Sequence, residues 1–181
     1  MKSNFFSTPL VISLLLLTGC GGYTTKSVLP DNIKTIHVMP VKNAINLATE
    51  VSDQESFRVT RPGLEVELTN AIINRFIFDG NLKVVMPDKA NAVVEATLID
   101  YRRDALRYTE SDDVQEYRLS VTMNVVLRQT TDNKVIWQQD NLVGDTTFFL
   151  SGSHATSEDE AVVKAVDDAA RRVVEKTIEI W

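Results

Sequence analysis

Few side chains in this 181-residue sequence are of the types and spacing that catalysis or metal binding needs. The two histidines, His37 and His154, are not at ligand spacing from each other or from a cysteine, so a zinc or iron site is not indicated. The run Ser151-Gly152-Ser153-His154 lacks the glycine on each side of the serine that a nucleophile elbow requires. We therefore expect no catalytic residue, no metal and no cofactor, and predict that the protein is not an enzyme.

An acidic run, Glu158-Asp159-Glu160, is a second candidate for chemistry, because clustered carboxylates can bind cations or transfer protons. It directly follows Ser157, however, and a serine with a glutamate three residues later is typical of a helix capping box. Negative charge at the N-terminus of a helix is favoured by the helix dipole. We interpret the run as the start of a helix.

Positive charge gathers at Arg102, Arg103 and Arg107, with Arg118 further along the chain. The guanidinium group matches the geometry of phosphate and carboxylate, so the first three arginines are candidate contacts for an anionic ligand such as a lipid headgroup. The alternative, which the sequence favours, is a solvated hairpin. Four nearby carboxylates would balance its charge: Asp104, Glu110, Asp112 and Asp113.

The single cysteine, Cys20, ends an N-terminal segment with the layout of an export signal. A basic start at Lys2 precedes an apolar run from Pro9 to Leu17 and then small residues. That run is shorter than the roughly 20 apolar residues that span a bilayer, so we expect it to be removed on export. The sequence Leu17-Thr18-Gly19-Cys20 resembles the lipobox of bacterial lipoproteins. The resemblance implies a diacylglyceryl group on the Cys20 sulfur, cleavage before Cys20 and acylation of the new N-terminus.

The alternative for Cys20 is a buried free thiol in a short internal helix. We expect lipidation, because position, spacing and flanking residues agree, and several acyl chains give stable anchoring. Gly21 follows the cysteine in place of the aspartate that retains many lipoproteins at the inner membrane. By resemblance to that sorting rule, we expect a lipid anchor in the outer membrane.

Composition limits the remaining classes of protein. Hydrophobic residues make up 44% of the chain and charged residues 24%, both usual for a globular protein. The net charge of −6 argues against binding nucleic acid, which needs a basic surface. We predict a signal peptide over 1–19, a tether over 20–32 and one α+β domain over 33–181. With the cysteine acylated, no disulfide forms within the mature monomer.

The order of sequence patterns predicts the fold. Apolar alternation predicts strands at 34–41, 82–85, 92–101, 114–128 and 134–148. Helical spacing predicts one helix from Pro62 to a stop at Gly80 and another from Ser157 to the C-terminus. A charged loop is expected at 104–113, and the polar segment 43–61 shows no periodicity. We expect two helices on one face of a four- to five-stranded mixed, mainly antiparallel sheet.

A series of short motifs runs along most of the chain after the signal. They are Cys20-Gly21-Gly22-Tyr23, the segment 29–38, the Val41-Lys42-Asn43 step and the segments 64–71, 90–101 and 116–119. Taken in order, these motifs resemble those of the LptE family of lipopolysaccharide-assembly lipoproteins. The resemblance implies a fold of two helices on one face of a four-stranded sheet.

The resemblance also implies a function without catalysis. Members of this family help to assemble and plug the outer-membrane β-barrel LptD, through which lipopolysaccharide reaches the cell surface. The expected partners are therefore LptD, lipopolysaccharide and the membrane that holds the anchor. The domain would lie on the periplasmic side or within the barrel lumen, and a polar sheet face suits a lumen, since barrel interiors are polar.

Two other functions remain open at this point. An outer-membrane lipoprotein that activates a peptidoglycan synthase would favour a long flexible tether, whereas the segment after Cys20 is short. An envelope enzyme would need a catalytic group, for which Ser153 is the nearest candidate.

Overall fold

A computed structural model of the chain describes residues 33–45, 56–58 and 61–178. The predicted signal peptide, Cys20 and the tether lie outside the described residues. The strands are β1 (Thr35–Val38), β2 (Lys42–Asn43), β3 (Ser56–Arg58), β4 (Lys83–Val84), β5 (Ala92–Tyr108), β6 (Val114–Gln129) and β7 (Val135–Phe149). The helices are α2 (Leu64–Asp79), the short 3-10 helix η2 (Pro87–Lys89) and α3 (Glu158–Ile178).

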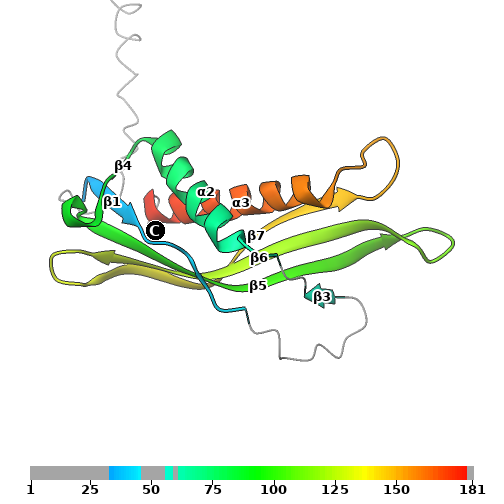
Figure 1. The fold of residues 1–181 in the computed structure, drawn as a ribbon, viewed down its shortest axis with the longest axis horizontal. Coiled ribbons are helices and arrows are strands. Elements are labelled where there is room, and N and C mark those ends of the chain that lie inside the picture. The colour runs from blue at the N-terminus through cyan, green and yellow to red at the C-terminus, as the bar shows by residue number, and fades with distance from the viewer. Residues whose placement is uncertain (1–32, 46–55, 59–60, 179–181) are drawn as a thin grey trace, which may run out of the picture.

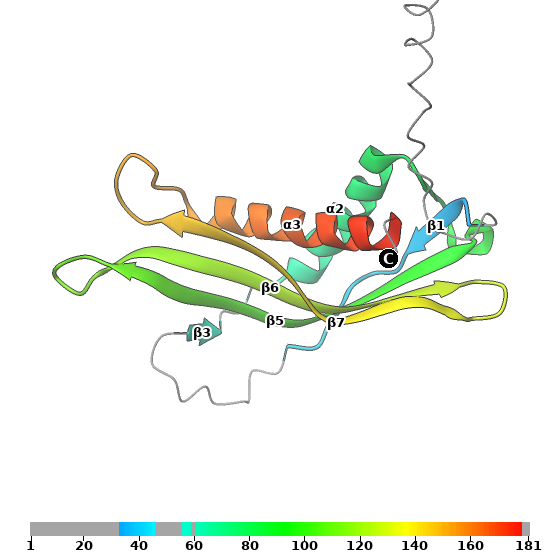
Figure 2. The ribbon, with the colours of Figure 1, turned by 180° about the vertical axis from the view of Figure 1, so that it is seen from behind.

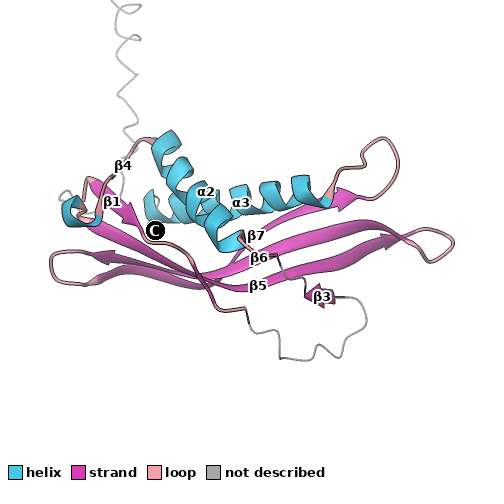
Figure 3. Ribbon diagram, viewed as in Figure 1, coloured by secondary structure: helices cyan, strands magenta, loops and turns pink. Residues whose placement is uncertain are grey.

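The strands form one mixed sheet in the order β4-β1-β5-β6-β7, with β2 and β3 also pairing with β5. Three long antiparallel strands, β5, β6 and β7, make up most of it, while β1 runs parallel to both β4 and β5. Both long helices cover the same face of this sheet (Figures 1 and 3). The predicted α+β class is therefore confirmed.

Burial along the strands follows the alternation in the sequence. On β6 the side chains of Leu119, Val121, Met123, Val125 and Leu127 are fully buried. Of the residues between them, Thr122, Asn124 and Val126 are partly exposed, and Ser120 is buried. A strand turns successive side chains to opposite faces, so one face of the sheet becomes core and the other stays partly in water. The view from behind shows the helices on the core side only (Figure 2).

The helices complete the core with stripes at helical spacing. On α2 the buried side chains are Leu64, Leu68, Ile72 and Phe76. On α3 the buried stripe is rich in alanine and valine, which lets this helix approach the sheet closely. At Gly144 of β7, an added Cβ would lie 2.6 Å from the carbonyl oxygen of Ala165 and would also collide with Ala169. Glycine at that position is what allows α3 to rest directly on β7.

Helix boundaries largely match the predicted signals. Gly80, in the left-handed region at φ 76°, ends α2, and its N–H donates to the Phe76 carbonyl. The Glu160 N–H donates to Ser157 Oγ at 3.2 Å, which confirms the capping serine at the start of α3. The first helix begins at Leu64 and not at Pro62, because Gly63 takes a left-handed conformation, φ 86°, directly before it.

The predicted loop at 104–113 is wrong in extent. Strand β5 continues to Tyr108, so only 109–113 connects it to β6. The cause is backbone pairing: Arg103 lies opposite Leu119 and Asp104 opposite Arg118, and the ladder continues whatever the charge of the side chains. The unassigned segment 43–61 also contains a strand, β3, which pairs antiparallel with β5 at 102–104.

Candidate functional site

The three candidate arginines lie within strand β5 and not at a loop tip. The Arg102 Nε is 3.0 Å from Asp104 Oδ2, and the Arg107 Nε is 3.6 Å from Glu116 Oε2. Arg103 is the least exposed of the three, with 27% of its side chain accessible against 48% for Arg102 and 61% for Arg107. Each guanidinium therefore has a carboxylate neighbour, and Arg107 keeps the largest surface for an outside group.

Arg103 connects the sheet to the start of α3. Its Nη1 donates to Glu158 Oε2 at 2.6 Å, and its guanidinium carbon lies 4.6 Å from the centre of the Tyr117 ring. An arginine stacked on an aromatic ring and paired with a carboxylate has its fork held in place. Arg103 therefore links strand β5 to strand β6 and to the start of helix α3.

Two residues of the acidic run at 158–160, Glu158 and Asp159, pair with arginines. Asp159 accepts a hydrogen bond from Arg61 Nη1 at 2.7 Å, and this bond raises the pKa of the Arg61 guanidinium. Burial raises the pKa of Tyr101 to about 12, helped by the negative charge of Glu158. Glu158 and Asp159 thus serve as ion-pair partners at the N-terminus of α3, in line with the predicted structural role.

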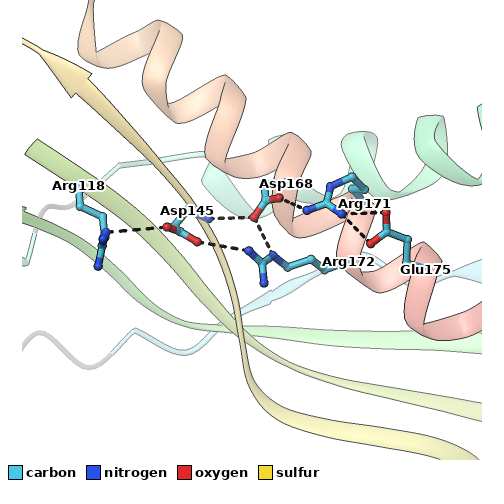
Figure 4. A network of polar contacts seen from close by, with 6 residues as sticks. All are labelled: Arg118, Asp145, Asp168, Arg171, Arg172 and Glu175. Atoms are coloured by element: carbon cyan, nitrogen blue, oxygen red, sulfur yellow. Dashed lines mark hydrogen bonds and ion pairs between the residues drawn. The ribbon is translucent and has the colours of Figure 1, made fainter. Parts of the chain in front are cut away.

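A network of six charged residues lies along the edge formed by β7 and α3, and the sequence interpretation missed it (Figure 4). It runs through Arg118, Asp145, Arg172, Asp168, Arg171 and Glu175. The spacing of its α3 members at three and four residues was a readable signal, because such pairs meet on one helix face. Arg118 and Asp145 join it only once β6 has paired with β7 and α3 has packed on β7.

Asp168 is the centre of this network. Its carboxylate accepts hydrogen bonds from Arg171 and from Arg172 Nε, the latter at 2.7 Å, and also from the backbone N–H of Asp145 at 3.2 Å. Burial by itself raises the pKa of this carboxyl group, but these hydrogen bonds outweigh burial and hold the pKa below its usual value. Asp168 is therefore anionic in the folded protein and ties α3 to β7.

The sheet face away from the helices carries polar side chains along the two central strands. Cross-strand pairing places Thr97 opposite Asn124 on this face, and Arg128 Nε is 3.7 Å from Glu95 Oε1. These residues are only partly buried. The face is therefore suited to contact with water or with a polar surface.

Helix α2 presents apolar side chains to solvent on the side away from the sheet. Val66 is 57% exposed and Ile77 63%, and Phe78 is 82% exposed next to a groove of about 260 Å³ between α2 and α3. A helix at the surface of a monomer normally turns polar residues outward. An apolar outer row of this kind is typical of a surface that contacts a partner.

The other residues considered in the sequence as catalytic or metal-binding candidates are His37, Ser153 and His154. His37 Nδ1 lies 3.0 Å from the carbonyl oxygen of Val85, between neighbouring strands. Ser153 and His154 are exposed in the approach to α3. Within the residues that the structure describes, no three histidine, cysteine or acidic side chains gather as a metal site. Over the same residues, no helix has the length and apolar character to cross a membrane.

The protein is a two-layer α+β domain. The charged residues along β7 and α3 pair with one another, while the polar face of the sheet and the outer side of α2 are exposed. The sequence profile of the LptE family, described as lipopolysaccharide-assembly, matches residues 33–177. The chain belongs to this family. The predicted resemblance is thereby confirmed, and with it the assignment to outer-membrane lipoproteins of lipopolysaccharide assembly, a family without enzymatic activity.

Solved structures are similar to this chain at low sequence identity. Lipoprotein B from Nitrosomonas europaea is 14% identical, with a TM-score of 0.51 over 82% of this chain and 84% of its own. A minor lipoprotein from Acinetobacter baumannii is 13% identical, with a TM-score of 0.49 over 82% of this chain and 94% of its own. No curated protein sequence matches the chain.

Proposed function

We propose that this domain is a non-catalytic partner of the outer-membrane barrel LptD, which it helps to assemble and plug so that lipopolysaccharide is delivered to the cell surface. The observation that carries the proposal is the family match across 33–177, which spans nearly all of the described domain. The proposal includes the predicted domain organisation, with one folded unit after a tether at 20–32.

Two surfaces of the domain support binding inside or beneath a barrel. The polar face of β5 and β6 fits a water-filled lumen, because the inner walls of such barrels are polar. The apolar outer row of α2, with Val66 and Ile77, offers the less polar contact that a stable protein interface needs at its centre. The two surfaces are on opposite sides of the sheet, so a surrounding partner could use both.

The test is which protein stays with the domain after gentle detergent extraction and crosslinking of native membranes. We expect a large β-barrel protein to be recovered in stoichiometric amount. Recovery of a peptidoglycan synthase in its place would support the alternative function. Recovery of no barrel from crosslinked membranes would contradict the proposal.

We further propose that Cys20 carries the lipid that anchors the domain to the periplasmic leaflet of the outer membrane. Lipidation of Cys20 is testable apart from the barrel. The Cys20→Ala variant should keep its signal peptide and lose the acyl mass on its N-terminus, as measured by mass spectrometry. Fractionation of Cys20→Ala with the outer membrane, as for wild type, would contradict the anchor.

For the arginines, we propose that Arg102, Arg103 and Arg107 contribute unequally to contact with an anionic group of lipopolysaccharide. Arg107 is the best placed, because it is the most exposed and its nearest carboxylate is 3.6 Å away. Arg107→Gln should weaken lipopolysaccharide binding, while Arg103→Gln should mainly lower stability through loss of the Glu158 contact. Equal binding by wild type and Arg107→Gln would contradict this assignment.

A further inference from the structure

One end of the domain combines exposed lysines with exposed apolar side chains. We name it the basal surface and define it by Lys34, Lys83 and Lys89 together with Phe78 and Met86. It lies where the described domain begins, at Ile33. Figure 1 shows the end of α2, β4, η2 and the start of β1 gathered there, away from the β5–β6 hairpin and the start of α3.

Backbone contacts bring the three lysines together from separate segments. Strands β1 and β4 pair in parallel, and the Lys83 N–H donates to the Lys34 carbonyl at 3.0 Å. The Thr35 hydroxyl donates to the Lys89 carbonyl at 2.9 Å. All three lysine side chains are exposed. Asp79 and Asp88 belong to the same segments, and the β6–β7 hairpin beside Asn91 adds Asp132 and Lys134. Four lysines against three aspartates leave an excess of one positive charge here, although the whole chain carries a charge of −6.

The apolar members of the basal surface are unusually open to solvent. Phe78 is 82% exposed and Met86 69%. Phe78 lies in the last turn of helix α2, and Met86 lies between β4 and η2. Exposed large apolar side chains next to lysines are the combination that binds the boundary between lipid headgroups and acyl chains.

The position of this surface relative to Cys20 selects the occupant. The segment 21–32 cannot span more than about 43 Å, even when fully extended. Strand β5 starts at the basal end and, with 17 residues, carries the opposite end of the domain about 55 Å away. A lipid on Cys20 therefore holds the basal end within about 43 Å of the membrane, while the hairpin end lies about 55 Å further along β5.

We infer that the basal surface docks on the anionic phospholipid surface of the membrane that holds the Cys20 lipid. The inference rests on the proposed anchor at Cys20, but not on the identity of the barrel. The lysines attract the lipid phosphates, and Met86 and Phe78 enter the headgroup region. Docking fixes the orientation of the domain as well as its distance from the bilayer.

The experiment uses the lipidated protein in vesicles of phosphatidylethanolamine and phosphatidylglycerol that carry bromine on the acyl chains. Since the single native cysteine is acylated, a fluorescent label can be placed selectively on a Met86→Cys variant. The matched control is a label on Leu106→Cys, which is 41% exposed and lies near the far end of β5. We expect quenching of the label at position 86 and little at position 106, with the difference falling as salt is added.

Charge variants test the lysines directly. Replacing Lys83 or Lys89 by glutamine should lower the ratio of docked to undocked protein roughly five-fold for each lysine, as read from the quenched fraction. Lys164→Gln is the control, because Lys164 is equally exposed but lies on α3. Vesicles of phosphatidylcholine alone should give the undocked signal.

The outcomes separate docking from anchoring. If the protein floats with the vesicles and the labels at 86 and 106 are quenched equally, the docking proposal is overturned and the anchor stands. If mass spectrometry finds no acyl group on Cys20, the anchor itself fails. Quenching at 86 that is unchanged by the lysine variants and by salt would overturn the role of the anionic lipid.

Discussion

At the scale of single residues, Gly144 shows how little room separates α3 from the sheet. A methyl group there would meet the backbone of α3 at Ala165 and Ala169, which cannot rotate away as a side chain could. We expect Gly144→Ala to lower the free energy of unfolding by about 1–3 kcal/mol, as overpacking of a core does. Urea unfolding would measure it, with Thr147→Ala, an exposed site on the same strand, as control. Equal midpoints for wild type and Gly144→Ala would contradict the close packing.

Asp168 and its neighbour Asp167 offer a matched pair for testing the charged network. The folded pKa of Asp168 is lower than its unfolded value, so its stabilisation is complete above the unfolded pKa and is lost as the pH falls through the folded one. Asp168→Asn should therefore cost about 1–3 kcal/mol at neutral pH, and the difference from wild type should shrink below about pH 4. Asp167 is exposed, and Asp167→Asn should change little at either pH. A pH-independent difference for Asp168→Asn would rule out the ion pairs as its source.

At the scale of elements, the start of α3 depends on a serine that can be tested alone. Ser157 Oγ accepts the Glu160 N–H, a bond that alanine cannot make. We expect Ser157→Ala to lower the free energy of unfolding by about 1 kcal/mol, measured by thermal or urea unfolding. Ser153→Ala, which removes an exposed hydroxyl nearby, should leave stability unchanged. A loss of any hydrolytic activity in Ser153→Ala would instead contradict the prediction that the protein is not an enzyme.

Elements with strong local signals were predictable from the sequence, and elements held by distant partners were not. The alternation along β6 and the glycine that ends α2 are encoded within a few residues, and both were found. The outer half of β5, with Arg102 and Arg107, has a charged composition that resembles a loop. It is a strand because β6 supplies its hydrogen-bond partners from a distance in sequence. The link from Asp145 to Arg172 was missed for the same reason, since their contact exists only after α3 packs on β7.

At the scale of the whole molecule, the two sides of the domain differ in polarity and would contact different kinds of surface on a partner. The sheet offers a polar face, while α2 offers an apolar row in which Val66 and Ile77 are more than half exposed. Among the described residues of α3, Val163 is the only exposed large apolar side chain, at 54%. We therefore assign the apolar contact with the proposed barrel partner to α2.

This assignment predicts the behaviour of two equally exposed valines. Val66→Asp should reduce recovery of the barrel from crosslinked membranes while the unfolding free energy stays within about 0.5 kcal/mol of wild type. Val163→Asp, as the matched substitution on α3, should leave recovery unchanged. The readout is the amount of barrel protein per domain after detergent extraction. A stronger effect of Val163→Asp would move the contact to the other helix.

The hydrogen bond from the Asp145 N–H to the Asp168 carboxylate also affects how copies of the domain can associate with one another. Strand β7 lies at one edge of the sheet. An edge strand with unpaired backbone groups can pair with the same strand of another molecule. In this domain the Asp168 carboxylate of α3 already accepts the Asp145 N–H, which is one of the backbone donors along the edge of β7. The pairing of β7 with β6 is also irregular near Asn141, whose φ is 53°. We expect these two features to disfavour edge-to-edge pairing of β7 between two copies of the domain.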